Sequence, residues 1–82
     1  MEFELSNHAA KRINERQIEM RWIEMTLAEP ELDEPDAVDL NARHALRRIA
    51  EMDNRVLRVV YNTTCPVRII SVYFDRGRRG KL

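Results

Sequence analysis

The sequence predicts an α+β domain in which one strand and two helices precede a three-stranded antiparallel meander, with both helices packed on one sheet face. Three observations carry this prediction. Charged and apolar residues alternate from Glu2 to Leu5, as in a short strand. Apolar residues then recur at helical spacing as far as Ala28. Residues 55–62 and 67–74 are rich in valine, isoleucine, leucine and tyrosine, and this composition favours strands.

The first helix is predicted to begin after Ser6, whose hydroxyl can accept a hydrogen bond from a free backbone N–H at the helix start. Ala9 and Ile13 follow at helical spacing. A fresh apolar pattern begins at Glu19, so we expect the helix to bend or restart around Gln17-Ile18.

The second helix, residues 19–28, has more apolar residues than one core stripe needs. We expect the stripe to consist of Met20, Ile23 and Leu27. Trp22 and Met25 then lie on another side, where they either cover the sheet edge or form a partner surface.

The segment Glu29 to Asp39 contains six acidic residues without a clear period, and Pro30 and Pro35 end the preceding helix. We expect a loop there. His44 to Met52 is interpreted as the first arm of a hairpin, because the turn signal Met52-Asp53-Asn54 follows it.

The last two strands are joined by a turn at residues 62–66, and a mobile basic tail is expected over residues 76–82. At 82 residues the chain has room for a single domain, 1–82. No apolar run is long enough to span a membrane, and the N-terminus lacks a signal-peptide pattern. With Cys65 as the only cysteine, we expect a cytoplasmic protein.

The net charge of zero conceals two oppositely charged halves. Residues 1–40 contain four basic and eleven acidic residues, whereas residues 41–82 contain ten basic and three acidic ones. Of the fourteen basic residues twelve are arginine, whose planar fork suits two-point contacts with phosphate or carboxylate. Two interpretations stay open, and the split can serve both: the halves neutralise each other in the fold, or the basic half binds phosphate.

Several segments resemble a known family. Ser6-Asn7-His8-Ala9, with Arg12 and Arg16-Gln17-Ile18, is similar to the opening motif of a small bacterial family of unknown function, numbered 4258. The strands Leu57 to Tyr61 and Ile69 to Tyr73 look like its paired terminal strands. This family looks like a branch of the RelE/ParE toxin superfamily.

The resemblance implies a toxin-like, metal-independent endoribonuclease that acts on mRNA, free or on the ribosome, and is silenced by a cognate antitoxin. Two alternatives are a gyrase-inhibiting toxin and a non-catalytic domain that binds nucleic acid or protein. Two departures from the family pattern stand out. Gln17 replaces the usual glycine, so a left-handed helix end there should be strained or absent. The chain also has only two lysines, Lys11 and Lys81, which weighs against ribosome-dependent cleavage.

RNA cleavage of this type needs a base, an acid and cations around the phosphate. The candidate catalytic residues are His8, Arg16, Tyr73 and Arg76, with His8 as the base. The candidate RNA- or phosphate-binding residues are Arg12, Arg47, Arg48, Arg58, Arg78 and Arg79. Structural roles compete with these assignments: capping of its own helix for His8, packing for Tyr73, and ion pairs with nearby acids for the arginines.

No metal or other cofactor is predicted, because His8, His44 and Cys65 lack the paired spacing of ligands. Monomer and homodimer are both compatible with the sequence, and no membrane partner is expected.

Overall fold

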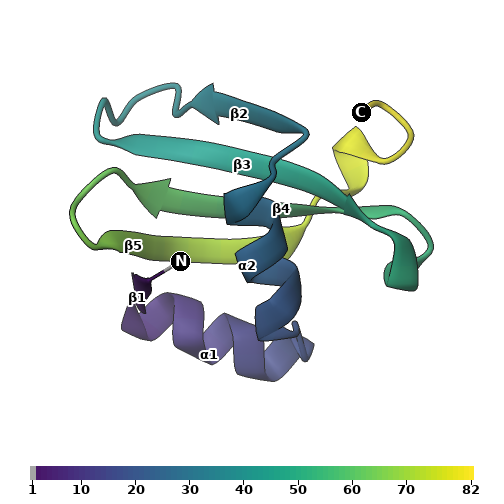
Figure 1. Cartoon of the computed structure of the whole chain (residues 1–82), viewed down its shortest axis with the longest axis horizontal. Coiled ribbons are helices and arrows are strands. Elements are labelled where there is room, and N and C mark those ends of the chain that lie inside the picture. Colours follow the sequence, from purple (N-terminus) through teal and green to yellow (C-terminus); the bar gives the residue numbers. More distant parts are fainter. Residues whose placement is uncertain (1) are drawn as a thin grey trace.

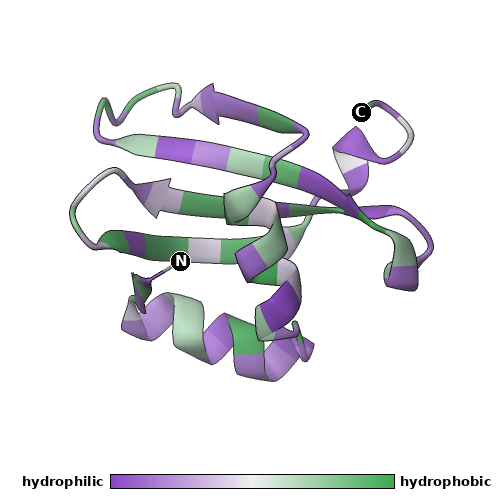
Figure 2. Ribbon diagram, in the orientation of Figure 1, coloured by the Kyte–Doolittle hydropathy of each residue, from purple (hydrophilic) through white to green (hydrophobic). Residues whose placement is uncertain are grey.

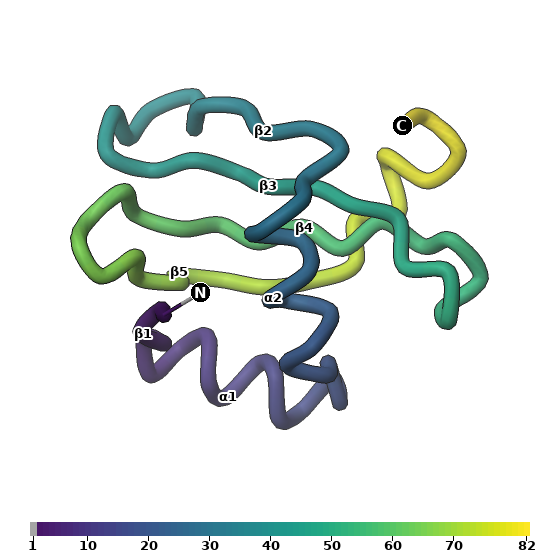
Figure 3. The backbone as a smooth tube through the Cα atoms, viewed as in Figure 1, coloured from purple at the N-terminus to yellow at the C-terminus, as the bar shows by residue number. Residues whose placement is uncertain are grey.

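The computed structural model describes residues 2–82 as a five-stranded sheet with two α-helices and two short 3-10 helices (Figure 1). In chain order the elements are β1 (Phe3–Leu5), α1 (Asn7–Arg16), α2 (Met20–Ala28), β2 (Leu32–Pro35), β3 (Ala42–Ile49), η1 (Ala50–Met52), β4 (Arg55–Asn62), β5 (Val67–Phe74) and η2 (Arg76–Arg78). The backbone trace in Figure 3 shows α2 crossing one face of the sheet and α1 running along β5.

The strands lie in the order β1-β5-β4-β3-β2. β1 pairs with β5 in parallel, and every other neighbouring pair is antiparallel. The predicted α+β class is confirmed, and β3, β4 and β5 pair antiparallel as predicted. They nevertheless belong to a mixed sheet of five strands in the described residues, so the expected extent of the sheet is corrected.

The additional strand is β2, which lies in the segment predicted to be a loop. Leu32 and Glu34 are half-buried, whereas Asp33 and Pro35 are exposed, so burial alternates as in an ordinary strand. Pro35 is tolerated because β2 is the sheet edge, where a missing N–H costs no ladder bond to a further strand. Acidic residues and proline hid this strand from a propensity-based prediction, since both are depleted in strands.

The helix boundaries follow the predicted capping and restart. The Ser6 hydroxyl accepts from the Ala9 N–H at 3.0 Å and donates to the Ile70 carbonyl of β5 at 3.1 Å. α1 ends at Arg16, and its C-cap residue Gln17 adopts the left-handed conformation, with φ 52° and ψ 44°. The Ile18 N–H then reaches back to the Ile13 carbonyl at 3.0 Å. The left-handed helix end is therefore present without glycine. Gln17 adopts a conformation that is sterically unfavourable for residues with a Cβ atom.

The core lies between α2, α1 and the facing side of the sheet. Its fully buried members include Ile23, Leu57, Val59, Ile69 and Val72. Figure 2 shows hydrophobic residues along β4 and β5, whereas β2 is mostly hydrophilic.

The predicted core stripe of α2 requires a correction. Trp22 is 5% exposed and belongs to the core, while Met20 is 41% exposed. The buried residues Trp22, Ile23 and Thr26 define the face of α2 that meets the sheet, and Met20 lies outside it. Because α2 is a new helix, the direction of its buried face depends on how the chain turns between the helices.

The C-terminal segment passes from β5 toward the far edge of the sheet (Figure 1). Asp75 caps η2 by accepting from the Gly77 N–H at 2.9 Å. Arg78 reaches Glu34 of β2 at 2.8 Å, and Arg79 reaches Asp53 at 2.7 Å. Hydrogen bonds and ion pairs thus connect residues 76–79 to the rest of the fold. The mobility expected for residues 76–82 stays a prediction.

We expect Gln17→Gly to stabilise the protein by about 0.5–1 kcal/mol, because glycine adopts the left-handed conformation without the steric cost that glutamine bears. Urea titration followed by circular dichroism measures the change. Ala10→Gly in the middle of α1 is the matched control and should destabilise by up to about 1 kcal/mol. A loss of stability in Gln17→Gly would contradict the interpretation.

Candidate functional site

Most arginines of the second half of the chain are ion-paired with acids of the first half. Arg43 binds Asp33 at 2.8 Å and Arg48 binds Glu31 at 2.7 Å. The hydrogen bonds from Arg48 lower the pKa of Glu31. For these residues, mutual neutralisation of the two halves is confirmed.

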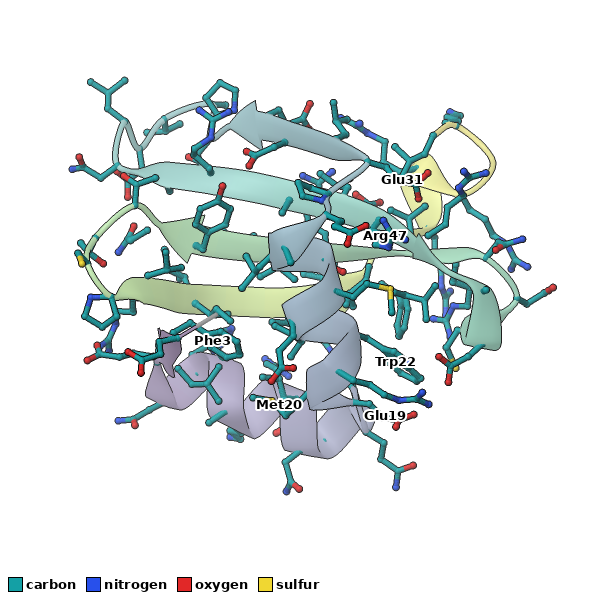
Figure 4. All side chains as sticks on the ribbon, in the orientation of Figure 1. Phe3, Glu19, Met20, Trp22, Glu31 and Arg47 are labelled. Atoms are coloured by element: carbon teal, nitrogen blue, oxygen red, sulfur yellow. The ribbon has the colours of Figure 1, made fainter. Side chains whose placement is uncertain are left out.

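Four arginines form no ion pair within the described residues 2–82. They are Arg16, Arg47, Arg55 and Arg76. Arg47 lies beside α2 (Figure 4) and donates to the Glu29 carbonyl at 2.6 Å. The other three converge at one end of the sheet.

Their meeting place is a pair of adjoining hollows of about 450 and 470 Å³. Both hollows are lined by Arg55, Phe74 and Arg76. The first is completed by Arg16, Met52 and Tyr73, and the second by Val56, Asp75 and Arg79. We call the region lined by Arg16, Arg55, Tyr73, Phe74 and Arg76 the arginine cleft.

Arg16 reaches the cleft from the last turn of α1. Its Nη1 donates to the Val72 carbonyl at 3.1 Å, at the stretch of β5 that extends beyond its pairing with β1. A backbone carbonyl takes one N–H of the guanidinium and carries no full charge, so the positive charge of Arg16 is not neutralised there.

Arg55 is held by aromatic stacking. Its guanidinium carbon lies 4.3 Å from the centre of the Phe74 ring. Phe74 in turn meets Trp22 edge-on, with ring centres 6.1 Å apart. Trp22 projects from α2 toward this end of the sheet (Figure 4). A cation over an aromatic face is attracted by the ring electrons, so the core aromatics orient Arg55 without cancelling its charge.

Tyr73 and Arg76 complete the cleft at the end of β5. Tyr73 and Phe74 are successive strand residues and therefore point to opposite faces of the sheet. The cleft thus wraps around the end of β5. Arg76 is exposed and opens η2 directly after Asp75.

The structure brings together three of the four predicted catalytic residues, Arg16, Tyr73 and Arg76. His8 is exposed at the other end of α1, eight residues from Arg16, which corresponds to about 12 Å along the helix axis. Arg12, between them, pairs with Glu15 at 3.3 Å. His8 therefore lies outside the cleft.

The predicted phosphate-binding arginines are mostly engaged elsewhere. Arg79 lines one hollow while its guanidinium binds Asp53. Arg58 of β4 binds Asp75, which follows β5, and Arg78 of η2 binds Glu34 of β2.

Arg55 was not among the residues predicted from the sequence for this site, because it belongs to no recognisable motif. Leu57 pairs with Phe74, so extending this register places residue 55 opposite residue 76. A correct strand register would therefore have found Arg55.

A polar relay occupies the sheet face opposite the helices; it consists of Asp36, His44, Arg58 and Asp75. His44 Nε2 lies 2.7 Å from the Asp36 carboxylate, and His44 Nδ1 lies 2.6 Å from Arg58 Nη1. Arg58 is 8% exposed and donates twice to Asp75 Oδ2, at 2.9 and 2.6 Å.

Hydrogen bonds set the pKa values of both carboxylates of the polar relay. Donation from the Asp39 N–H, His44 and the Val38 N–H lowers the pKa of Asp36 from 3.8 to about 2. Burial raises the pKa of Asp75, but Arg58 and the Gly77 N–H outweigh burial, so the net pKa is lowered. Both ends of the relay therefore favour the charged carboxylate.

Across residues 2–82, no group of three or more His, Cys, Asp or Glu side chains is arranged to hold a metal ion. None of the helices in that range has the length and apolar character needed to cross a bilayer.

The family model described as a domain of unknown function, DUF4258, matches residues 5–74, and the chain belongs to this family. The matched range runs from the end of β1 to the end of β5 and includes Arg16, Arg55 and Tyr73. Neither a curated protein nor a solved structure matches the chain. The resemblance to the family is confirmed, and its link to the RelE/ParE toxins stays a prediction.

We expect acid to destabilise the fold partly through Asp36. Because its folded-state pKa of about 2 lies below the ordinary 3.8, the carboxylate stabilises the fold above pH 3.8. This stabilisation is lost as the pH falls through about 2. Asp36→Asn should therefore lower stability at neutral pH and flatten the pH dependence across that window.

Urea titrations at a series of pH values measure this effect. Glu24→Gln, which removes an exposed carboxylate of α2, is the control and should keep the wild-type slope. An unchanged slope in Asp36→Asn would count against the role of Asp36.

Proposed function

We propose that the chain binds RNA in the arginine cleft and cleaves it as a toxin-like, metal-independent endoribonuclease. The observation that carries the proposal is the convergence of Arg16, Arg55 and Arg76, which form no ion pair within the described residues, around Tyr73. Eight of the twelve arginines pair with a carboxylate within the described residues. Three unneutralised guanidinium groups at one place favour an anionic ligand from outside.

The proposed reaction is an internal transfer at phosphorus. The ribose 2′-oxygen attacks the phosphorus and forms a 2′,3′-cyclic phosphate, while the bond from phosphorus to the 5′-oxygen breaks. The 2′-hydroxyl proton passes to water in the open cleft, and the Tyr73 phenol protonates the departing 5′-oxygen. Water then returns a proton to Tyr73, so the overall proton count is unchanged.

The arginines supply the electrostatic part of this reaction. Negative charge on the phosphate oxygens increases as the fifth bond to phosphorus forms, and guanidinium groups placed beforehand stabilise it most at that stage. Arg55 also offers a flat face, held on Phe74, on which a base can stack. His8 has no role in this proposal, because it lies about 12 Å from Arg16 along the axis of α1.

A non-catalytic binding domain is the second candidate. It is favoured by the cleft lining, in which the carboxylate of Asp75 is engaged by Arg58 and no histidine takes part among the residues described. A phenol alone is a weak base near neutral pH. Intact RNA bound at the cleft would support this candidate.

The proposal includes a cytoplasmic location and a cognate antitoxin. Val38 and Leu40 are 88% and 97% exposed on the loop between β2 and β3, and Asp36 holds that loop by accepting from the Val38 and Asp39 N–H groups. An ordered loop that presents two aliphatic side chains is suited to contact another protein. A gyrase-type target would also need such a contact surface.

We expect purified protein to cleave single-stranded RNA in the presence of EDTA and to leave 2′,3′-cyclic phosphate ends. Arg76→Ala should lower the rate about 100-fold or more through loss of charge stabilisation. Tyr73→Phe should lower it by a similar factor through loss of proton transfer. His8→Ala should change it less than about threefold.

End-labelled RNA on denaturing gels measures these rates. Arg43→Ala, at the opposite end of the sheet, is the matched arginine control and should retain the wild-type rate. Binding without cleavage would favour the second candidate. The absence of any RNA binding would refute both the proposed cleavage and the proposed binding of RNA.

We also expect RNA affinity to fall steeply with salt. Three phosphate contacts on a single strand correspond to a slope of about −2 in log affinity against log salt. Removing Arg55 or Arg76 should make the slope less negative by about 0.7, and Arg43→Ala should not change it. Fluorescence anisotropy at several salt concentrations measures the slopes, and equal slopes in all variants would place the binding outside the arginine cleft.

A further inference from the structure

The polar relay crosses the sheet and ends beside the arginine cleft. Asp36 follows β2, His44 lies in β3, Arg58 lies in β4 and Asp75 follows β5. Each side chain contacts the next at 2.6–2.9 Å through the hydrogen bonds between them. The relay therefore joins four neighbouring parts of the sheet by side chains alone.

The chemistry of the groups fixes the direction of each hydrogen bond. A guanidinium group can only donate, so His44 Nδ1 accepts from Arg58. The proton of the neutral imidazole then resides on Nε2, which donates to Asp36. Arg58 is thereby held from two sides: His44 takes one N–H and Asp75 takes two others.

Asp75 transmits this constraint to η2. One carboxylate oxygen accepts from Arg58, and the other accepts from the Gly77 N–H at 2.9 Å. The Asp75 backbone N–H is also bound to the Val56 carbonyl at 2.8 Å. A Cβ at position 77 would lie 3.3 Å from this carboxylate, so Gly77 permits the close approach. The hydrogen bond from the Gly77 N–H to the Asp75 carboxylate spans Arg76, which lies between these two residues in the chain.

We propose that Arg58 is a positioning residue, which orients Arg76 in the arginine cleft through Asp75 and η2. This inference rests on the proposed function in so far as it treats the cleft as an anion-binding site. Arg58 itself is nearly buried and is bound by His44 and Asp75, so it does not contact the ligand. Its effect on the ligand passes through the orientation of Arg76.

The test combines RNA binding with a double-mutant cycle. The probe is a short fluorescent single-stranded RNA, and the proteins are wild type, Arg58→Lys, Arg76→Ala and the double variant. Arg58→Lys retains the charge but loses the fork that holds His44 and Asp75 together. We expect Arg58→Lys to weaken RNA binding at least fivefold in the presence of Arg76 and less than about 1.5-fold in its absence. Coupling of this kind marks residues that act as a unit.

Arg43→Lys is the matched control, because Arg43 also donates to an aspartate, Asp33, from a strand of the same sheet. It should not change RNA binding in either background. Equal effects of Arg58→Lys with and without Arg76 would overturn the inference, because a general structural role would produce the same loss in both.

A second measurement needs no RNA. In ¹⁵N relaxation spectra, the amides of Arg76 and Gly77 should lose order in Arg58→Lys and keep it in Arg43→Lys. Unchanged amides in Arg58→Lys would overturn the inference even if RNA binds. If wild-type protein fails to bind RNA while these amides lose order, the proposed function falls and the positioning role stands.

Discussion

Ion pairing between the acidic segment and the arginines of the sheet determines how large the sheet is and where positive charge remains. β2 has two acids and a proline among its four residues, and such a strand has little intrinsic tendency to form. Its pairing with β3 is supported by two arginines, since Arg43 donates to Asp33 within β2 and Arg48 donates to Glu31 directly before it. Tyr61 adds a third contact by donating to Asp33 at 2.6 Å.

The same pairing sorts the arginines into two classes. Eight of them pair with carboxylates within the described residues. Of the four that do not, Arg47 lies beside α2, whereas Arg16, Arg55 and Arg76 meet at the end of β5. The distinction depends on position, because all twelve have the same chemistry. Burial of Trp22 and Phe74 then serves two purposes, since the aromatic pair closes the core and its outer ring supports Arg55.

The two faces of the sheet have different kinds of interior. The helix-covered face is apolar, with Leu57 and Val59 of β4 fully buried. The opposite face contains the polar relay, in which Arg58 is nearly as buried as these residues. A buried guanidinium group is costly unless its donors are bound, and His44 and Asp75 bind them. Because those two partners lie on β3 and at the end of β5, satisfying Arg58 also ties the C-terminal segment to the sheet.

Local sequence chemistry was sufficient for the helix start at Ser6, the interruption near Gln17 and the long strands 55–62 and 67–74, because capping groups and strand composition act within a few residues. The candidate catalytic residues were His8, Arg16, Tyr73 and Arg76, and the structure brings the last three together. Only the tertiary structure decided that β2 is a strand, that Trp22 rather than Met20 is buried, and that His8 lies away from the cleft that includes Arg55. Each of these outcomes depends on the partner that a distant segment brings alongside, and a carboxylate, an indole or a guanidinium group is the same in sequence whether or not that partner arrives.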